Sequence, residues 1–345
     1  MQTIIKKIDA DEFGSAVTCS HFGDSPLPLV IQPANEKHRD LDALLDWASA
    51  HRDALDRAIA DHGAVLLRDF AVDDTAQFEK VSELFPAYEM GYEGGATARA
   101  QIAGKVFEAT RVPPDVWIML HQEMAYMRTY PAKLAFFCKI AAEGGGETTI
   151  GDMRKFTAAL PPQLLEEIAS KGVRYQRNFR SPDTRDERSN PVFNHRTWVE
   201  AFYTEDRNEV EADCHARGLD FEWLPDGSIT TWNTLPGTAR HKRDGDTVYF
   251  SQLHTQIPHP RWMGANWDAY SAVYKADVAK PYDASFGDGT PLSDADIRTI
   301  YDGLDRITVS FPWQHGDVLF VDNIHTAHGR NPFVGKRDVQ VALLA

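Results

Sequence analysis

Residues 316–330 read GDVLFVDNIHTAHGR, and this stretch decides the fold that we expect. Its first part is a short apolar run, which predicts a buried strand, and the Asp-Asn pair at its end is typical of an Asx turn. Two histidines, His325 and His328, follow this turn. Imidazole nitrogens are common ligands of first-row metal ions, so either histidine could bind a metal at the end of the strand.

The arrangement of apolar runs along the rest of the chain predicts the fold class. Helical spacing marks the ranges 38–62, 73–85 and 155–172, whereas short apolar runs separated by turn residues predict strands at 64–70, 117–124, 133–140, 173–179, 228–232, 247–254, 307–313, 317–323 and 337–345. Early helices followed by many short strands favour a mainly β fold, a sandwich or jelly roll with peripheral helices. We expect a single catalytic domain over residues 1–345, with N-terminal helices and a helical or loop insertion around 155–245.

Composition excludes several classes of function. The chain has 345 residues, of which 43% are hydrophobic and 25% charged, and its formal net charge is −15. Such an acidic balance argues against nucleic-acid binding and against a basic membrane-binding surface. The three cysteines form no CxxC pair, and neither a secretory signal nor an apolar run of about 18 residues is visible. We therefore expect a soluble, cytoplasmic protein without a membrane or nucleic-acid partner.

A second chemically informative segment is WIMLHQEMAY at 117–126. If it is a strand, His121 and Glu123 point to the same face, because side chains alternate with a period of two. A lone His-x-Glu is weak, since a histidine beside a carboxylate is more often an ion pair. A further ligand, His325 or His328, would complete a set of two histidines and one carboxylate. That set leaves three positions of an octahedral iron for a bidentate cosubstrate and oxygen.

The order of these segments resembles the TauD/TfdA family of Fe(II)- and 2-oxoglutarate-dependent dioxygenases, and within it the SyrP-like subgroup. The matching text is HGAVLLRDF (62–70), GGATAR (94–99), LHQEMAY (120–126), PAKLAFFCKIAAEGGGETTIGDMR (131–154), FEWLPDG (221–227), FPWQHGDVLFVDN (311–323) and HGRNPFVGKRDVQVAL (328–343). The resemblance implies a double-stranded β-helix, the cupin-like jelly roll, with Fe(II) as cofactor and 2-oxoglutarate and O2 as cosubstrates.

The same resemblance implies which residues hold the metal. In that family the distal ligand is the histidine followed by Gly-Arg, which implies His328 rather than His325. The ligand set is then His121, Glu123 and His328, acting in catalysis through the metal. The usual family motif is His-x-Asp, and the glutamate here matches a subset that includes clavaminate synthase. Related halogenases have Gly or Ala at this position, so Glu123 disfavours halogenation.

The cosubstrate requires a cation for its distal carboxylate, and arginine is suited to it because its planar fork can bind a carboxylate through two bonds. Arg337 shares a face of its predicted strand with Val339 and Val341. The family's arginine pairs with a threonine after a Gly-Gly-x-Thr turn, which implies Thr148. The competing residue is Arg330, for which the alternative interpretation is a salt bridge. This chain departs from many relatives by having an acidic residue, not a basic one, directly after Arg337.

Substrate recognition is the least determined part of the sequence. Candidate substrate-binding residues are Thr97 and Arg99 in the glycine-rich segment, Thr110, and His254 in the predicted strand 247–254. The resemblance implies hydroxylation of an unactivated C–H bond of an amino acid, free or tethered to a carrier protein, in specialised metabolism. Desaturation, epoxidation or cyclisation would use the same chemistry. Outside this class, a metal-binding jelly roll without turnover and a zinc hydrolase are the alternatives.

A carrier protein as partner would need a basic docking surface. Carrier domains are acidic, so a chain with net charge −15 would repel them at long range. The segments RNFRSPDTRDER (177–188) and ARHKR (239–243) are the candidate basic patches. If neither forms such a surface, a free small molecule is the favoured substrate.

Overall fold

The computed structural model describes residues 5–8, 11–90, 101–109, 112–190, 193–276 and 278–345. The chain divides into two compact units. Unit 1 comprises residues 1–160, 239–250 and 302–345, and unit 2 comprises 161–238 and 251–301. The insertion that we expect around 155–245 overlaps unit 2. The assignment of residues 1–345 to one catalytic domain stays a prediction.

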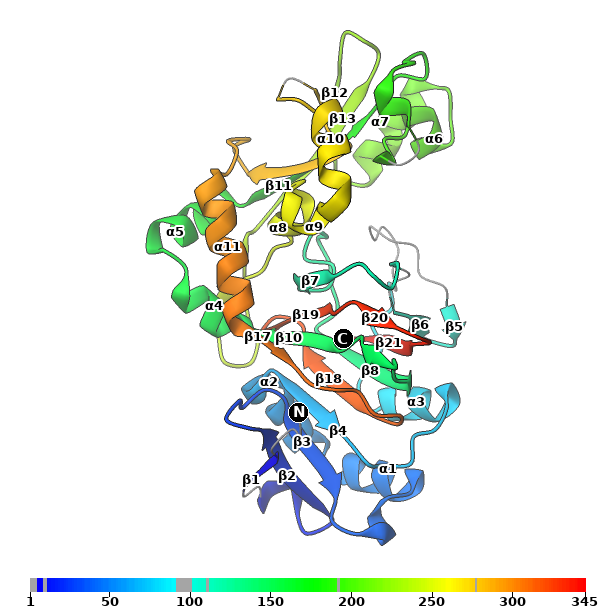
Figure 1. Ribbon diagram of the computed structural model, residues 1–345, viewed down its shortest axis with the longest axis vertical. Coiled ribbons are helices and arrows are strands. Elements are labelled where there is room, and N and C mark those ends of the chain that lie inside the picture. Colours follow the sequence, from blue (N-terminus) through cyan, green and yellow to red (C-terminus); the bar gives the residue numbers. More distant parts are fainter. Residues whose placement is uncertain (1–4, 9–10, 91–100, 110–111, 191–192, 277) are drawn as a thin grey trace. The chain divides into compact units, whose positions relative to one another are not determined.

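Unit 1 is built on two β-sheets (Figure 1). The larger sheet has the order β1 (Ile5–Ile8), β2 (Val17–Phe22), β3 (Leu29–Pro33), β4 (Ala64–Leu67), β18 (Val318–Asp322), β8 (Lys133–Ile140), β21 (Asp338–Leu344), β6 (Val106–Glu108) and β5 (Gln101–Ala103). The smaller sheet has the order β17 (Thr308–Ser310), β10 (Thr148–Asp152), β19 (Thr326–Arg330) and β7 (Ile118–His121). Neighbouring strands are antiparallel except for β3 and β4. Short ladders join β14 (Thr238–Arg240) to β15 (Thr247–Tyr249) and β20 (Phe333–Val334) to β9 (Gly144–Gly145).

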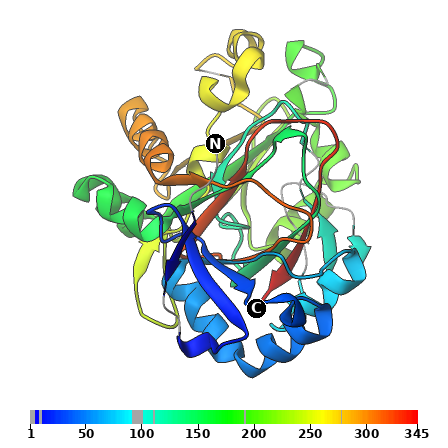
Figure 2. The same cartoon turned by 60° about the horizontal axis from the view of Figure 1, so that its bottom comes forward.

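Alternating side chains of the central strands fill two separate apolar layers. In β18, Val318 and Phe320 pack toward helices α1 (Leu41–Ala50), α2 (Arg52–His62) and α3 (Thr75–Ser82). The intervening Leu319 and Val321 pack in the other layer, together with Ile150 of the smaller sheet. Figure 2 shows the blue and cyan helices beside the larger sheet. Because both faces are buried, the strands read as continuous apolar runs. The expectation of a mainly β fold with peripheral helices is confirmed.

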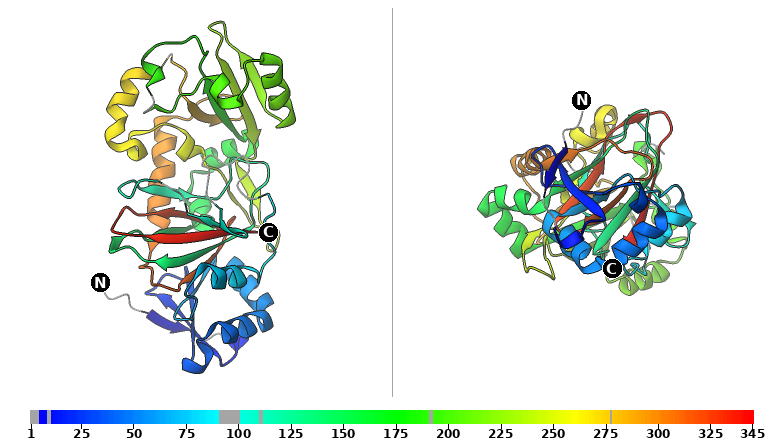
Figure 3. Two further views of the ribbon diagram at one scale, coloured as in Figure 1. Left: turned by 90° about the vertical axis from the view of Figure 1, so that its right-hand side faces the viewer. Right: turned by 90° about the horizontal axis from the view of Figure 1, so that it is seen from below.

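Unit 2 has its own sheet and helices (Figure 3). Its antiparallel sheet has the order β12 (Asp220–Trp223), β13 (Ile229–Leu235), β11 (Val173–Phe179) and β16 (Tyr282–Phe286). Its helices are α5 (Pro162–Lys171), α6 (Trp198–Phe202), α7 (Arg207–Ala216), α8 (Leu253–Gln256), α9 (Pro260–Met263) and α10 (Trp267–Val273). Helix α4 (Met153–Ala159) belongs to unit 1, and α11 (Asp294–Ile307) spans residues assigned to both units. In the described ranges, no helix is long and apolar enough to cross a membrane.

Some predicted elements differ from those observed, for local reasons. The single helix expected at 38–62 is two helices, because His51 leaves helical geometry (φ −112°, ψ 21°) and ends α1. The strand expected at 247–254 ends at Tyr249, so the prediction that His254 lies in a strand is wrong. A helical turn forms there instead, and the Ser251 hydroxyl accepts a hydrogen bond from the Leu253 amide at 3.1 Å. Side-chain bonds of this kind compete with strand pairing.

A buried ion pair joins two strands of the larger sheet, and its loss should destabilise the protein. Arg68, directly after β4, donates to both carboxylate oxygens of Asp317, before β18, at 2.9 and 2.6 Å. The two side chains are only 4% and 1% exposed. Asp317→Asn leaves the arginine charge buried without its counter-charge, so we expect a loss of about 3–5 kcal/mol in the free energy of unfolding, measured by urea denaturation.

The matched control is Arg57→Gln. Its ion pair with Glu12 is 46% and 47% exposed on the two sides, so its loss should cost less than about 1 kcal/mol. Equal costs for the two variants would contradict this account of the buried pair.

Candidate metal centre and cosubstrate site

The two histidines of the predicted ligand set lie opposite each other on neighbouring strands. In the ladder between β19 and β7, His328 is the direct partner of His121, and on its other side it pairs with Ile150 of β10. The centroids of the two imidazole rings are 4.4 Å apart. The close approach of β7 requires Gly329, because a Cβ atom there would lie 2.4 Å from the Ile118 carbonyl oxygen. Strand register therefore brings together histidines that are distant in the sequence.

Glu123 reaches the histidines by a different route from the one expected. The predicted strand ends at His121, so strand alternation does not orient the glutamate. The turn after β7 orients the glutamate instead, and the buried Asn323 side chain binds the backbone of Glu123. The Asn323 Oδ1 accepts from the Glu123 amide at 2.7 Å, and its Nδ2 donates to the Glu123 carbonyl at 3.0 Å. The next residue, Met124, has a left-handed φ of 59°. Such a conformation persists where surrounding contacts hold it.

The spacing of the three side chains fits a shared metal ion. One ligand atom from each of His121, Glu123 and His328 can be chosen so that all lie within 4.8 Å of one another. The Glu123 Oε2 is 3.4 Å from the His328 Nε2. Two donors at bond lengths of about 2.1 Å and angles near those of an octahedron or tetrahedron lie about 3.0–3.4 Å apart. The donor set of two imidazoles and one carboxylate suits Fe(II) with open positions.

Protonation of the histidines is compatible with metal binding. The His121 Nδ1 lies 2.9 Å from the Met119 carbonyl oxygen, so this nitrogen carries the proton and the lone pair of Nε2 is directed to a ligand. In the part of the chain that the structure describes, the His328 Nδ1 has no hydrogen-bond partner, and its Nε2 faces Glu123. His325 is fully buried but does not join this set. The structure thus brings His328, and not His325, to the other two residues.

Arg337 lies next to Thr148, as the resemblance implies. Its Nε donates to the Gly146 carbonyl at 2.8 Å, and its Nη2 is 3.5 Å from the Thr148 hydroxyl. Trp313 also donates to that hydroxyl, at 3.1 Å. Burial, and then the charge of Arg330, lower the pKa of Arg337 to about 10, so it stays charged at neutral pH. Among the described residues no carboxylate forms an ion pair with it. A half-buried cation without an ion-pair partner among the described residues suits an anionic ligand.

The competing arginine, Arg330, is bound to the backbone. Its Nη1 donates to the Val112 carbonyl at 3.0 Å, and its Nη2 donates to those of Pro113 and Val116 at 2.7 and 2.6 Å. The alternative interpretation, a salt bridge, is replaced by bonds to carbonyl groups that hold the 112–116 loop. Because these bonds occupy both ends of the guanidinium, Arg337 is the better candidate for a carboxylate of 2-oxoglutarate.

Of the four predicted substrate-binding residues, only His254 lies in the described part of the chain. Thr97, Arg99 and Thr110 lie outside the described residues. His254 lies in α8 of unit 2 with 1% of its surface exposed, and its carbonyl accepts the Tyr301 hydroxyl at 2.8 Å. A role for any of these four in substrate binding stays a prediction.

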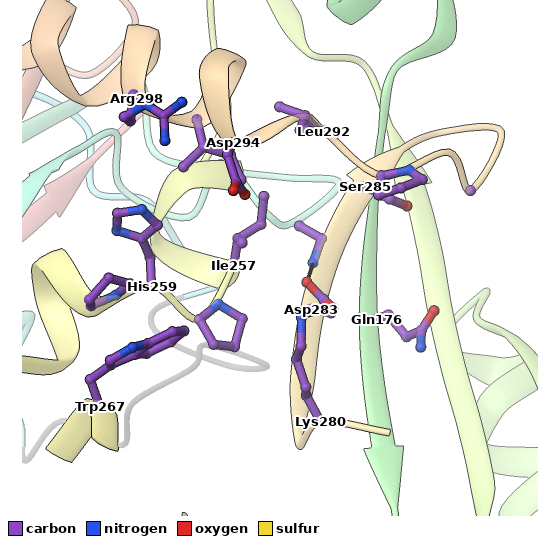
Figure 4. A pocket seen from close by; sticks show the side chains of 16 residues that line it. Gln176, Ile257, His259, Trp267, Lys280, Asp283, Ser285, Leu292, Asp294 and Arg298 are labelled. Atoms are coloured by element: carbon purple, nitrogen blue, oxygen red, sulfur yellow. Dashed lines mark hydrogen bonds and ion pairs between the residues drawn. The ribbon is translucent and has the colours of Figure 1, made fainter. Parts of the chain in front are cut away.

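A cavity of about 580 Å³ lies within unit 2 (Figure 4). Its lining includes Gln176 of β11, His259 at the N-cap of α9 and Arg298 of α11. Lys280 and Asp283 in its wall form an ion pair of 3.0 Å, drawn as a dashed line. None of the lining residues is a predicted metal or cosubstrate ligand, so this cavity is not the metal centre.

Two residues of the site, Asn323 and Trp313, were not predicted from the sequence. The Asx turn at Asp322 is observed, with its Oδ1 accepting from the Ile324 amide at 2.9 Å. The same Asp-Asn pair also supplies Asn323, whose contacts to Glu123 join segments 200 residues apart. Trp313 donates to the Thr148 hydroxyl, and the sequence around it, FPW, did not indicate this contact. Such contacts have no periodicity along the chain by which to recognise them.

A family model, "Taurine catabolism dioxygenase TauD, TfdA family", matches residues 24–343. The chain belongs to this family. It is a dioxygenase that uses Fe(II), 2-oxoglutarate and O2, and the jelly-roll prediction is confirmed. Membership of the SyrP-like subgroup stays a prediction.

Two curated relatives cover most of the chain. The dapdiamide synthesis protein DdaC of Enterobacter agglomerans is 33% identical over 307 residues, which are 88% of each chain. A clavaminate synthase-like protein of Arabidopsis thaliana is 30% identical over 331 residues, which are 94% of this chain and 95% of the relative. Among solved structures, PvcB of Pseudomonas aeruginosa has a TM-score of 0.56 and 13% identity, covering 99% of this chain and 95% of its own. This last likeness concerns the fold.

The contact between Asn323 and Glu123 can be tested by mutation. Asn323→Ala removes both backbone bonds that hold the glutamate, so we expect the affinity for Fe(II) to fall about 10- to 100-fold. The measurement is an anaerobic Fe(II) titration with 2-oxoglutarate, followed by the visible charge-transfer band. The control is Asn331→Ala, which removes a side-chain bond to Glu147 and should bind Fe(II) as the wild type does. Wild-type affinity in a folded Asn323→Ala protein would contradict the positioning of Glu123 by Asn323.

Proposed function

We propose that this dioxygenase hydroxylates an unactivated C–H bond of a free amino acid or a closely similar molecule in specialised metabolism. The observation that carries the proposal is the combination, in unit 1, of the His121–Glu123–His328 set with the half-buried Arg337, which forms no ion pair among the described residues. A carboxylate ligand at position 123 leaves no place for a halide in the manner of the related halogenases. The name of the relative DdaC, a dapdiamide synthesis protein, supports a role in natural-product synthesis.

Each part of the site has a defined task in this proposal. His121, Glu123 and His328 hold Fe(II), which when bound with 2-oxoglutarate supplies the oxidation of substrate by O2, with release of succinate and CO2. Arg337 and Thr148 bind the distal carboxylate of 2-oxoglutarate and so orient it. The Phe136 ring, 5.2 Å from that of His328, belongs to the apolar layer between the sheets and excludes water from this side. No protein nucleophile is needed.

The two basic segments differ in the positive charge that they expose. In 177–188, Arg180 is 7% exposed and donates to the His195 carbonyl at 2.6 Å, and Arg188 forms an ion pair with Asp186 at 2.8 Å. In 239–243, Arg240, Lys242 and Arg243 are exposed, whereas His241 is buried between acidic side chains. A carrier would therefore have to dock on those three side chains against the repulsion of a net charge of −15, and this repulsion favours a free substrate.

Turnover with free and carrier-loaded amino acids tests the proposal. With Fe(II), 2-oxoglutarate and O2, we expect a free amino acid to gain one oxygen atom, with one succinate formed per product, as measured by mass spectrometry. Loss of two hydrogen atoms instead would reassign the reaction to desaturation or cyclisation. Product from carrier-loaded substrates alone would refute the free-substrate proposal.

The two arginines should respond differently to conservative substitution. Arg337→Lys keeps the charge but loses the planar fork, so we expect the KM for 2-oxoglutarate to rise about 10- to 100-fold. Arg330→Lys should change this KM by less than about threefold, because its bonds are to backbone carbonyls. Steady-state succinate formation measures both. The opposite pattern would transfer the cosubstrate role to Arg330.

A further inference from the structure

A second buried cluster of metal-ligating side chains lies in unit 1, apart from the iron ligands. His241 comes from the β14–β15 hairpin, and Asp322 and His325 come from the turn between β18 and β19. Their exposed fractions are 8%, 3% and 0%. Ligand atoms from the three residues lie within 4.8 Å of one another, and the two imidazole ring centroids are 4.0 Å apart. This arrangement has no role in the proposed catalysis.

His241 lies between two carboxylates. Its Nε2 is 3.0 Å from the Asp322 Oδ2, and its Nδ1 is 3.0 Å from the Asp244 Oδ1. A neutral imidazole has one N–H, so it can donate to only one of them, and its other nitrogen presents a lone pair to an oxygen. An additional proton on the imidazole, or a metal ion bound to it, is needed to make both contacts favourable. The Asp322 bond raises the pKa of His241, so a proton competes for this position.

His325 also has a ring nitrogen whose lone pair no hydrogen bond among the described residues satisfies. Its Nδ1 lies 3.1 Å from the Ala60 carbonyl oxygen and therefore carries the proton. Its fully buried Nε2 has no hydrogen-bond partner among the described residues, and the Asp244 Oδ2 is 3.6 Å away. That separation is too long for a hydrogen bond, so the lone pair of Nε2 is available to a metal ion.

The charge around the cluster fits a dication. The buried Asp322 and the partly exposed Asp244 contribute two negative charges, and both histidines are neutral in a metal-binding state. The nearby cation, Arg154, is paired with Asp152 at 2.9 Å and also interacts with the charges of Asp322 and Asp244. Three carboxylates and one guanidinium leave an excess of negative charge, which a dication would balance.

We propose that His241, Asp322 and His325 bind a divalent cation of the zinc class at a second site, separate from the catalytic iron. Two imidazoles and one carboxylate form a donor set that zinc accepts, with a water molecule as the fourth ligand. The ion would join the 239–250 hairpin to the 322–325 turn. Because Asn323 in that turn holds Glu123, the bound ion stabilises the iron ligand set.

A zinc-binding measurement in the absence of the iron ligands tests this site and does not depend on turnover. His121→Ala/His328→Ala disables the catalytic centre and leaves the second cluster intact. After treatment with a chelator, equilibration with Zn²⁺ and desalting, we expect this variant to retain one zinc per chain by inductively coupled plasma mass spectrometry. The triple variant that adds His325→Gln should retain none. No retained zinc in the folded double variant, or unchanged zinc in the triple variant, would overturn the proposal.

Thermal unfolding and a matched histidine control complete the test. Zn²⁺ at about a hundredfold excess over Kd should raise the Tm of the double variant by roughly 3–8 °C. The control adds His315→Gln to the double variant. His315 is 54% exposed and lies 3.4 Å from Asp73, so its loss should leave both the bound zinc and the Tm shift unchanged. A Tm that does not respond to zinc in the double variant would also contradict a bound structural ion.

Discussion

The antiparallel register of β7, β19 and β10 is the constraint on which the proposed metal centre depends. It sets His328 between His121 on one side and Ile150 on the other. The His328 ring therefore faces the His121 ring, while Ile150 belongs to the apolar layer between the two sheets. A slip by one residue would turn these side chains to the opposite face of the sheet. Gly329 allows the strands to approach closely enough for both rings to reach one ion. The ligand geometry is thus a property of strand pairing.

The turn after β18 links this register to the carboxylate ligand. Asn323 binds the backbone of Glu123 on both sides, and Gln122 donates to the Ile324 carbonyl at 2.8 Å. The neighbouring Asp322 caps the turn and contacts His241. Buried polar networks specify a structure strongly when every member is satisfied, and they are costly when one is not. The proposed zinc ion would satisfy the acceptors that protein hydrogen bonds leave over.

Local charge, and not the net charge of the chain, determines what the site binds. The protein is acidic overall, at −15, yet the half-buried Arg337 is a cation that suits a dicarboxylate. In the same unit, the buried Asp322 lies with His241 and His325 in a cluster that we propose to bind a dication. Burial strengthens such interactions relative to water, because charges interact more strongly where the effective dielectric constant is low. The surface charge matters instead for approach of a macromolecular partner.

The amino-acid sequence by itself determined the elements whose pattern lies within one segment. The apolar runs predicted β8 and β18, and the family-like spacing predicted the ligand set and the Arg337–Thr148 pair that the structure brings together. It did not determine that β7 ends before Glu123, or that His241 meets Asp322. These features depend on hydrogen bonds between segments distant along the chain. Periodicity records only which face of an element is buried, so tertiary packing alone decided which polar groups meet there.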